Sequence, residues 1–299
     1  MSFAFYRDVS PWLRREVPLT PCPSPARGEG RAKGSVDAFA GIDVAFAKGK
    51  RLPIVVCTFC GIRLEPLPLR SAAAKPPVGK GNARILDRDT VRGFADETAA
   101  YLRRIESEFR ISIRCMAIDA PSDPKKIGAR RRLCEVGLDQ RGIRCITTPS
   151  IPEFEAIRKK AADHLASGGA ESRIPGANQL WMLVGFELFR RLREDWSCIE
   201  VFPQAIAATL DANHIHKSDR AGVIAQLKAV ALYTHWPKTA EVASLIYIAH
   251  GSFHDRLDAY LSAWVAALDD CDRIPIGQPP NDVIWVPHLP SPLEGEGQG

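Results

Sequence analysis

The sequence predicts an α/β fold in which a central mixed sheet carries helices on both faces. Near the start of the chain, short runs of alternating apolar and polar residues are separated by Gly and Pro, as in hairpin-linked antiparallel strands. Beyond residue 90, helical periodicity alternates with short apolar runs, as in the strand–helix–strand units of parallel sheets. The 299 residues, 45% hydrophobic and 25% charged, are ordinary for a globular protein with a substantial core.

The two ends of the chain resemble each other and differ from the middle. PCPSPARGEG (21–30) and LPSPLEGEGQG (289–299) share the pattern P-S-P-x-x-G-E-G. Neither has an apolar period that could join a core, so their composition favours disordered tails over the alternative of proline-rich recognition segments. We therefore expect tails at 1–35 and 287–299 and a single domain at 36–286.

The first three predicted strands form an antiparallel meander. They are DAFAGIDVAFA (37–47), RLPIVVCTFC (51–60) and GIRLEPLPL (61–69), joined by short gaps that contain Gly49 and Gly61. The prolines within these runs suit strand ends or an edge of the sheet.

The rest of the predicted domain alternates helices with buried strands. Residues 90–109 place apolar side chains at a 3.6-residue period, and the mostly apolar run ISIRCMAIDAP (111–121) follows as a strand that Pro121 ends. In chain order, the remaining predicted elements are a helix at 125–142, a strand at 143–149, helices near 153–165 and 177–194, a strand at 198–203 and a mostly helical segment at 205–268.

The cysteines do not form a zinc-site pattern. Cys57 and Cys60 make a C-x-x-C pair, but no second pair or H-x-x-x-H segment completes it in the sequence. The pair lies in a strand-like run whose alternation puts its members on opposite faces. We interpret the cysteines as small buried hydrophobic residues in a reducing compartment.

Neither a membrane span nor a secretory signal is predicted. No run approaches the ~18 apolar residues of a membrane helix, and the first residues lack a basic start followed by a long apolar core. We expect a cytoplasmic protein with no membrane association. The formal net charge of +5 permits a polyanionic partner without requiring one.

Acidic residues recur in the predicted buried strands. Asp43 lies in GIDVAFA, Asp119 follows MAI at the end of its strand, and Glu200 lies in CIEVFP. A carboxylate in an apolar strand costs free energy unless local hydrogen bonds or a divalent cation compensate for it. If the first and fourth strands are neighbours, Asp43 and Asp119 meet at the centre of the sheet.

A late helix brings two more carboxylates. In GSFHDRLDAYLSAW (251–264), Asp258 lies between Leu257 and Leu261 at the edge of an apolar stripe. Asp255 lies one turn earlier, where S-x-x-D also fits a capping box. Each acid has an ordinary interpretation on its own, as a cap, a turn residue or a solvent-facing side chain. Their recurrence at buried positions favours a shared site.

The motifs GIDVAFA, AIDAP, EVFPQA and HDRLDAYLSAW, in this order and spacing, resemble the family of predicted nucleases known as domain of unknown function 429, in the ribonuclease H-like superfamily. The resemblance spans residues 39–268. It implies a ribonuclease H-like fold whose central mixed five-stranded sheet combines a three-strand antiparallel meander with parallel strands. It also implies metal binding by Asp43, Asp119 and Asp258, with Asp255 or Glu200 as a fourth ligand.

Such a carboxylate cluster has a definite chemistry. Clustered carboxylates repel one another, and oxygen ligands favour Mg²⁺ or Mn²⁺ over zinc. Two ions about 4 Å apart would activate a water and stabilise the leaving oxygen in phosphodiester hydrolysis. Asp43 and Asp119 would hold the ions, and Asp258 would complete the ligand set. His254, at the helix start, is either a proton shuttle or an ordinary cap or surface residue.

A basic segment follows the strand that ends at Asp119. KKIGARRRL carries five cations, which are Lys125, Lys126, Arg130, Arg131 and Arg132. At the C-terminal end of a parallel strand, this segment would lie beside the metal site, where open sheets bind ligands. We expect it either to contact nucleic acid or to form a solvated helix face.

Three functions remain open from the sequence. The leading hypothesis is a divalent-metal-dependent nuclease. The second is a non-catalytic nucleic-acid-binding or regulatory protein that keeps the fold, and the third is a nucleotide-binding phosphotransferase. Against the third, Ala45, Phe46 and Ala47 stand where a glycine-rich phosphate hairpin would follow the first strand. The choice between DNA and RNA and the oligomeric state stay undetermined.

Overall fold

A five-stranded mixed sheet lies at the centre of residues 35–289, the part of the chain that the computed structural model describes. The strand order is β3-β2-β1-β4-β5, antiparallel from β3 to β1 and parallel from β1 through β4 to β5. The predicted meander and mixed sheet are thus confirmed. The predicted tails lie outside the described residues, apart from residues 35 and 287–289. The strands are β1 (Val36–Asp43), β2 (Ile54–Cys60), β3 (Arg63–Pro66), β4 (Ile111–Asp119) and β5 (Ser197–Glu200).

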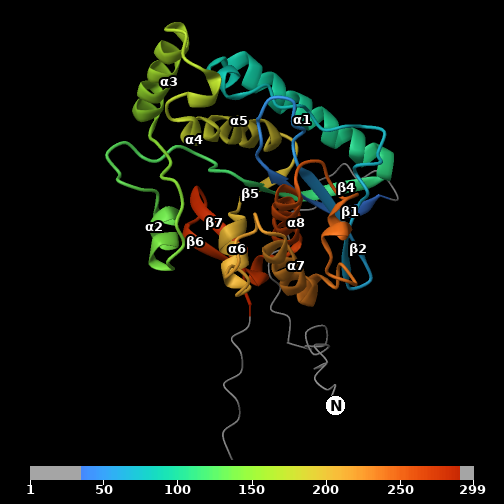
Figure 1. The fold of residues 1–299 in the computed structure, drawn as a ribbon. Helices are drawn as coiled ribbons and strands as arrows, with labels where there is room; N and C mark the ends of the chain where they lie inside the picture. The colour runs from blue at the N-terminus through green and yellow to red at the C-terminus, as the bar shows by residue number, and fades with distance from the viewer. Residues whose placement is uncertain (1–34, 290–299) are drawn as a thin grey trace, which may run out of the picture. The chain divides into compact units, whose positions relative to one another are not determined.

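One face of the sheet is covered by α1 and α5, together with parts of α3 and α4 (Figure 1). α1 begins after Asp87, whose side chain accepts a hydrogen bond from the backbone of Asp89, and ends at Arg110 in a left-handed conformation. Its apolar stripe, which includes Phe94 and Leu102, is buried on the sheet, as the helical periodicity predicted. These helices are α1 (Arg88–Phe109), α3 (Ile151–Ala166), α4 (Ala177–Leu180) and α5 (Met182–Leu192).

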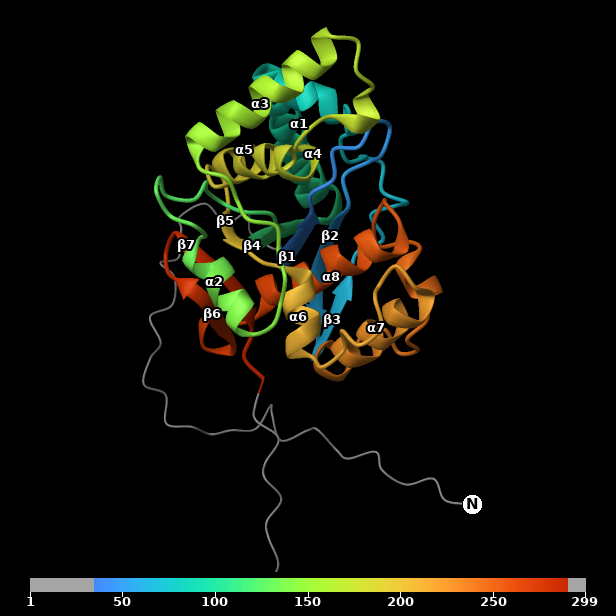
Figure 2. The ribbon, with the colours of Figure 1, turned by 60° about the vertical axis from the view of Figure 1, so that its left-hand side comes forward.

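The opposite face is covered by α8, with α6 and α7 beside it (Figures 1 and 2). α8 begins with a reciprocal capping box: the Ser252 hydroxyl accepts from the Asp255 backbone, and the Asp255 carboxylate accepts from the Ser252 backbone at 2.7 Å. Both the capping box and the mostly helical segment at 205–268 were predicted. The helices on this face are α6 (Pro203–Thr209), α7 (Arg220–Thr234) and α8 (Phe253–Ala267).

β1 lies between the two helical layers, so its side chains alternate between them. Ala40 and Ile42 pack with the cluster that contains α1. Gly41 faces α8 at such close range that a Cβ on it would lie 2.0 Å from the carbonyl oxygen of Ala259. Only glycine permits this approach. Asp43, two residues further, points to the same face as Gly41 because strand side chains alternate.

Two predicted elements are wrong. Residues 143–149 form no strand. β4 pairs with β1 on one side and with β5 on the other, so it has no edge left for another parallel strand. The predicted helix at 125–142 is reduced to α2 (Leu133–Gln140). Residues 125–132 form turns instead, with Gly128 at a φ of 83° that does not continue a helix.

A C-terminal hairpin was not predicted. It consists of β6 (Arg273–Gln278) and β7 (Asp282–Pro287), and it buries Ile276, Ile284 and Val286 in the cluster beneath α8. The cysteine interpretation also needs correction at two positions, since Cys57 is buried but Cys60, at the end of β2, and Cys271 are exposed. Within residues 35–289, no helix is both long enough and apolar enough to span a bilayer.

Candidate metal centre

The parallel pairing of β1 with β4 sets two aspartates side by side. Asp43 and Asp119 end their strands and are register partners. Cys115 and Ala117 pack in the cluster on the α8 side, so the alternation of β4 directs Asp119 to the same face as Asp43. The predicted meeting of these two residues at the centre of the sheet is therefore observed.

α8 adds the third carboxylate from above this face. The side chain of Asp258 comes within reach because α8 packs directly over Gly41. One carboxylate oxygen from each of Asp43, Asp119 and Asp258 lies within 4.8 Å of the others. Asp258 is only 4% exposed, and its Oδ1 has no hydrogen-bond partner among the described residues.

Burial and mutual repulsion make these carboxylates hard to ionise. Burial, followed by the charges of Asp258 and Asp119, raises the pKa of Asp43 well above its usual range. Burial and then the charge of Asp258 raise the pKa of Asp119 to about 8. Burial also raises the pKa of Asp258, although the ammonium of Lys217 opposes the shift. The positive charge near the cluster is therefore too small to balance three ionised carboxylates.

Lys217, in the loop before α7, supplies the cation that the site does have. Its Nζ donates a hydrogen bond to Oδ2 of Asp258. Burial lowers the pKa of Lys217, but attraction to Asp258 and then Asp119 and Asp43 outweighs burial and raises it. This residue was not predicted, because a single lysine in a loop between two helices carries no periodic or motif signal.

The residues present fit a hard divalent cation. All three candidate ligands are carboxylate oxygens, which Mg²⁺ and Mn²⁺ prefer. The open Oδ1 of Asp258 and the raised pKa values are what a missing positive charge would leave behind. One lysine against three acids leaves an excess of negative charge that a divalent ion would balance.

Comparison with known proteins identifies the family. Residues 73–281 match the family described as "Protein of unknown function (DUF429)". The chain belongs to the DUF429 family. The matched segment contains Asp119 and Asp258 and begins after Asp43. No curated protein and no solved structure matches the chain.

In this DUF429 chain, Asp255 and His254 lie at the edge of the cluster. Asp255 accepts the Ser252 backbone N–H through Oδ2, and its Oδ1 lies 3.0 Å from Nε2 of His254. Both oxygens are thus engaged, and Asp255 stands outside the group of three whose oxygens lie within 4.8 Å. The structure therefore gives Asp255 the capping role, and His254 remains half-exposed beside it.

Glu200 is committed to an ion pair rather than to the carboxylate cluster. Its two oxygens accept from Nη1 and Nη2 of Arg132 at 2.7 and 2.8 Å, and Oε2 also accepts from the backbone of Ser122. Its register partner on β4 is Ile118, not Asp119. As a fourth metal ligand, Glu200 would have to give up a buried bidentate pair.

The expected basic surface is largely absent from the segment 125–132. Arg132 is 3% exposed and serves Glu200, so its prediction as a surface cation is wrong. Arg131 pairs with Glu135 and Asp139, and Lys125 pairs with Glu153. The exposed cations of the predicted set are Lys126 and Arg130. The sequence could not show the pairs of Arg132 and Lys125, because their partners Glu200 and Glu153 lie on distant elements.

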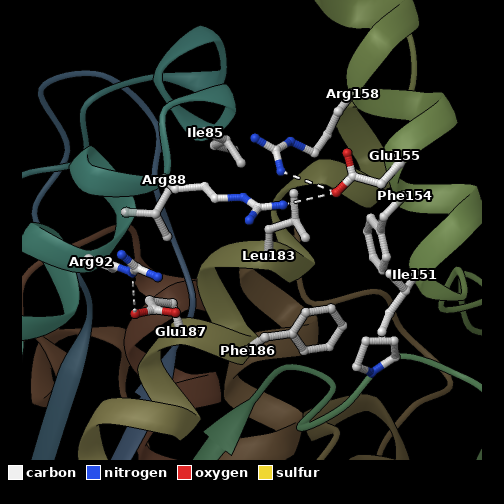
Figure 3. Close-up of a pocket in the computed structure, with 12 residues that line it drawn as sticks. Ile85, Arg88, Arg92, Ile151, Phe154, Glu155, Arg158, Leu183, Phe186 and Glu187 are labelled. Atoms are coloured by element: carbon white, nitrogen blue, oxygen red, sulfur yellow. Dashed lines mark hydrogen bonds and ion pairs between the residues drawn. The ribbon is translucent and has the colours of Figure 1, made fainter.

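Among the cavities of the described structure are two of about 260 Å³ each, and one of these adjoins Asp119. It reaches Asp119, and its lining includes Trp181, Phe202 and the exposed Arg144 and Gln204. The other lies among α1, α3 and α5, where Figure 3 shows arginines pointing toward glutamates. There Glu155 pairs with both Arg88 and Arg158, and Glu187 lies 3.8 Å from Arg92, so each lining arginine has an acidic partner.

Proposed function

We propose that residues 36–286 form a divalent-metal-dependent nuclease domain of the ribonuclease H-like type. The observation that carries the proposal is the convergence of Asp43, Asp119 and Asp258 from two adjacent strands and the helix that covers them. A meander continued by parallel strands is also the sheet arrangement that the resemblance implied. Membership of DUF429 places the chain in a family whose description states no activity.

The three aspartates would hold Mg²⁺ or Mn²⁺. When bound, such an ion supplies the charge that polarises a phosphodiester for attack by water. Asp43 and Asp119 are positioned by strand register, which makes their spacing rigid, and Asp258 is positioned by the packing of α8. If Asp258 held such an ion, the ammonium of Lys217 would be available to face the negative charge of a phosphate.

The cavity beside Asp119 supports a nucleotide substrate. It is large enough for a small planar ring system, and it lies just below the range of about 300–1,000 Å³ typical of drug-sized ligands. Trp181 and Phe202 offer aromatic surface there, and bases stack on aromatic side chains. Arg144 adds an exposed cation at the same lining.

A second candidate function has its own observation. Lys217 already neutralises part of the cluster, as an internal cation does in a site that has lost its metal. A non-catalytic nucleic-acid-binding or regulatory protein would show this arrangement as its permanent state. Metal binding separates the two functions, because a ligand that binds only the native state raises its melting temperature.

The test uses Asp258→Asn and the unaltered protein. We expect Mg²⁺ or Mn²⁺ to raise the melting temperature of the unaltered protein and to support cleavage of labelled single-stranded or duplex DNA or RNA. Asp258→Asn should lose both responses and keep its fold, since asparagine nearly conserves the volume. Asp163→Asn, an exposed carboxylate on α3, is the matched control and should behave like the parent.

The contradicting outcome is equally definite. If Asp258→Asn binds Mg²⁺ as tightly as the parent does, these carboxylates are not the metal site. If neither metal alters the melting temperature of the parent, the arrangement with Lys217 is permanent and the non-catalytic function replaces the nuclease.

A further inference from the structure

Arg256, in the first turns of α8, is buried and forms no ion pair with an acidic residue of the described part of the chain. Only 8% of the residue is exposed, and its Nε has no hydrogen-bond partner within residues 35–289. Its Nη1 reaches the carbonyl oxygen of Leu245 at 3.4 Å, and its guanidinium lies over the ring of Phe253. A buried arginine is normally paired with a carboxylate, so this charge calls for a counter-ion.

Three further cations gather at the same place. Arg70 donates to the carbonyl oxygen of Ile246 at 3.4 Å, and Arg51 donates to that of Pro76 at 2.8 Å. Lys75 donates to the carbonyl oxygens of two residues in its own loop. Backbone carbonyls are therefore the hydrogen-bond acceptors of all four cations in the described structure. Carbonyls satisfy the donors but leave the positive charge uncompensated.

The charges of these four cations all act on His250. Its Nε2 is buried and has no hydrogen-bond partner in the described structure. Burial, followed by the charges of Arg51, Lys75, Arg70 and Arg256, lowers the pKa of His250 to about 4. A histidine held neutral by four neighbouring cations marks a local excess of positive charge.

We propose that these five residues, here named the basic cluster (Arg51, Arg70, Lys75, His250 and Arg256), bind a phosphate group. A phosphate supplies the missing negative charge, and guanidinium groups match its oxygens with paired donors. The cluster runs from the exposed Arg70 and Lys75 to the buried Arg256, so an anion can approach from solvent and meet charge that water screens poorly.

The position of the basic cluster indicates which phosphate it takes. Arg256 precedes Asp258 by two residues on α8, and the charge of Asp255 acts on both Arg256 and Asp43. α8 therefore connects the basic cluster to the three aspartates, with Arg256 and Asp258 on different sides of the helix. Resting on the proposed function, the bound group is a backbone phosphate of the same nucleic-acid strand whose neighbouring phosphodiester lies at the aspartates. Free inorganic phosphate shares this chemistry.

The experiment is done with the full chain carrying Asp258→Asn in EDTA, so that neither metal binding nor cleavage affects the result. Fluorescence anisotropy measures binding of a labelled single-stranded oligonucleotide at several salt concentrations, and thermal shift measures binding of inorganic phosphate. Arg70→Met is the main variant, because its exposed side chain can be removed without harm to folding. Arg104→Met, exposed on α1 on the other side of the sheet, is the matched control.

We expect Arg70→Met to weaken oligonucleotide binding about tenfold and to reduce the salt slope by about 0.7, the value for one phosphate contact on a single strand. Arg104→Met should change neither. Arg256→Met should lose the phosphate response and yet unfold at the same temperature or higher without ligand, since it removes an unpaired buried charge.

If Arg70→Met and Arg104→Met bind both ligands equally, the basic cluster is not an anion site. If inorganic phosphate raises the melting temperature through Arg70 but the oligonucleotide does not bind there, the cluster takes free phosphate, and the assignment to a nucleic-acid strand is overturned. Because the readout needs no metal, either result is distinguishable from failure of the nuclease proposal.

Discussion

The fold makes ionisation of Asp119 unfavourable in the absence of metal. Its pKa of about 8 in the folded protein compares with about 3.9 for an aspartate in an unfolded chain. Between these two values the native state holds a proton that the unfolded state has released. The stability that Asp119 contributes through this proton is therefore fully present below pH ~4 and is lost as pH rises through ~8.

We predict that Asp119→Asn removes part of this pH dependence. In EDTA, urea unfolding between pH 5 and 8 should show the parent losing free energy of unfolding as pH rises. The variant's slope should be shallower by up to about 1.4 kcal/mol per pH unit, the limit for one proton. Asp163→Asn should keep the parent's slope. An Asp119→Asn protein that also keeps it would show that Asp119 is ionised in the fold.

At the level of elements, the contact between β1 and α8 holds the aspartates together. Gly41 is the point of closest approach, where an added Cβ would meet the backbone of Ala259 at 2.0 Å and of Ala263 at 2.3 Å. Backbone atoms cannot rotate away as side chains do, so any larger residue has to push the helix off the strand. Asp258 would move with the helix.

We predict that Gly41→Ala destabilises the protein by about 1–3 kcal/mol and weakens Mg²⁺ binding more than that loss alone explains. Urea unfolding and calorimetric titration with Mg²⁺ measure the two effects. Gly93→Ala, in α1, is the matched control, since a Cβ there meets nothing within 4 Å. It should stabilise the helix by up to about 1 kcal/mol. Unchanged metal binding in Gly41→Ala would mean that the helix position does not set the site.

The local sequence pattern predicted the helices and strands better than it predicted which side chains pair across the fold. Alternation in β1 and β4 and the apolar stripe of α8 were enough to bring Asp43, Asp119 and Asp258 together. Some failures are local, namely the strand predicted at 143–149 and the missed C-terminal hairpin, but the failures at the site concern pairings between distant segments. Nothing in the sequence distinguishes the buried Arg132 from the exposed Arg130, because the partner of Arg132, Glu200, lies on a distant strand. Lys217 and the basic cluster likewise depend on contacts between loop residues and distant segments such as α8, which leave no periodic signal in the sequence.

At the level of the whole molecule, Arg132 joins parts of the chain that are far apart in sequence. It pairs with Glu200 at the end of β5 and lies 3.4 Å from Asp282 in β7. Asp282 in turn accepts hydrogen bonds from the backbone N–H groups of Leu133 and Cys134 at the start of α2. One arginine thus ties the sheet edge, the C-terminal hairpin and α2 into one unit.

We predict that Arg132→Met destabilises the domain by about 3–5 kcal/mol, because Glu200 is left buried and unpaired. Arg114→Met, which breaks an exposed pair with Asp37, should change stability by about 0–1 kcal/mol. Urea unfolding followed by tryptophan fluorescence compares the two. Equal effects would show that the buried pair contributes no more than a surface one.

The order of the chain has a consequence for synthesis. The central strand β1 leaves the ribosome early, β4 follows after the meander and α1, and α8 comes near the end. Until α8 emerges, Asp43 and Asp119 face water, where their charges are hydrated and their repulsion is weak. The nascent chain can therefore build its sheet without a cation. The cluster of three carboxylates is complete only when nearly all of the protein has been made, so partly synthesised chains carry at most the adjacent pair of Asp43 and Asp119.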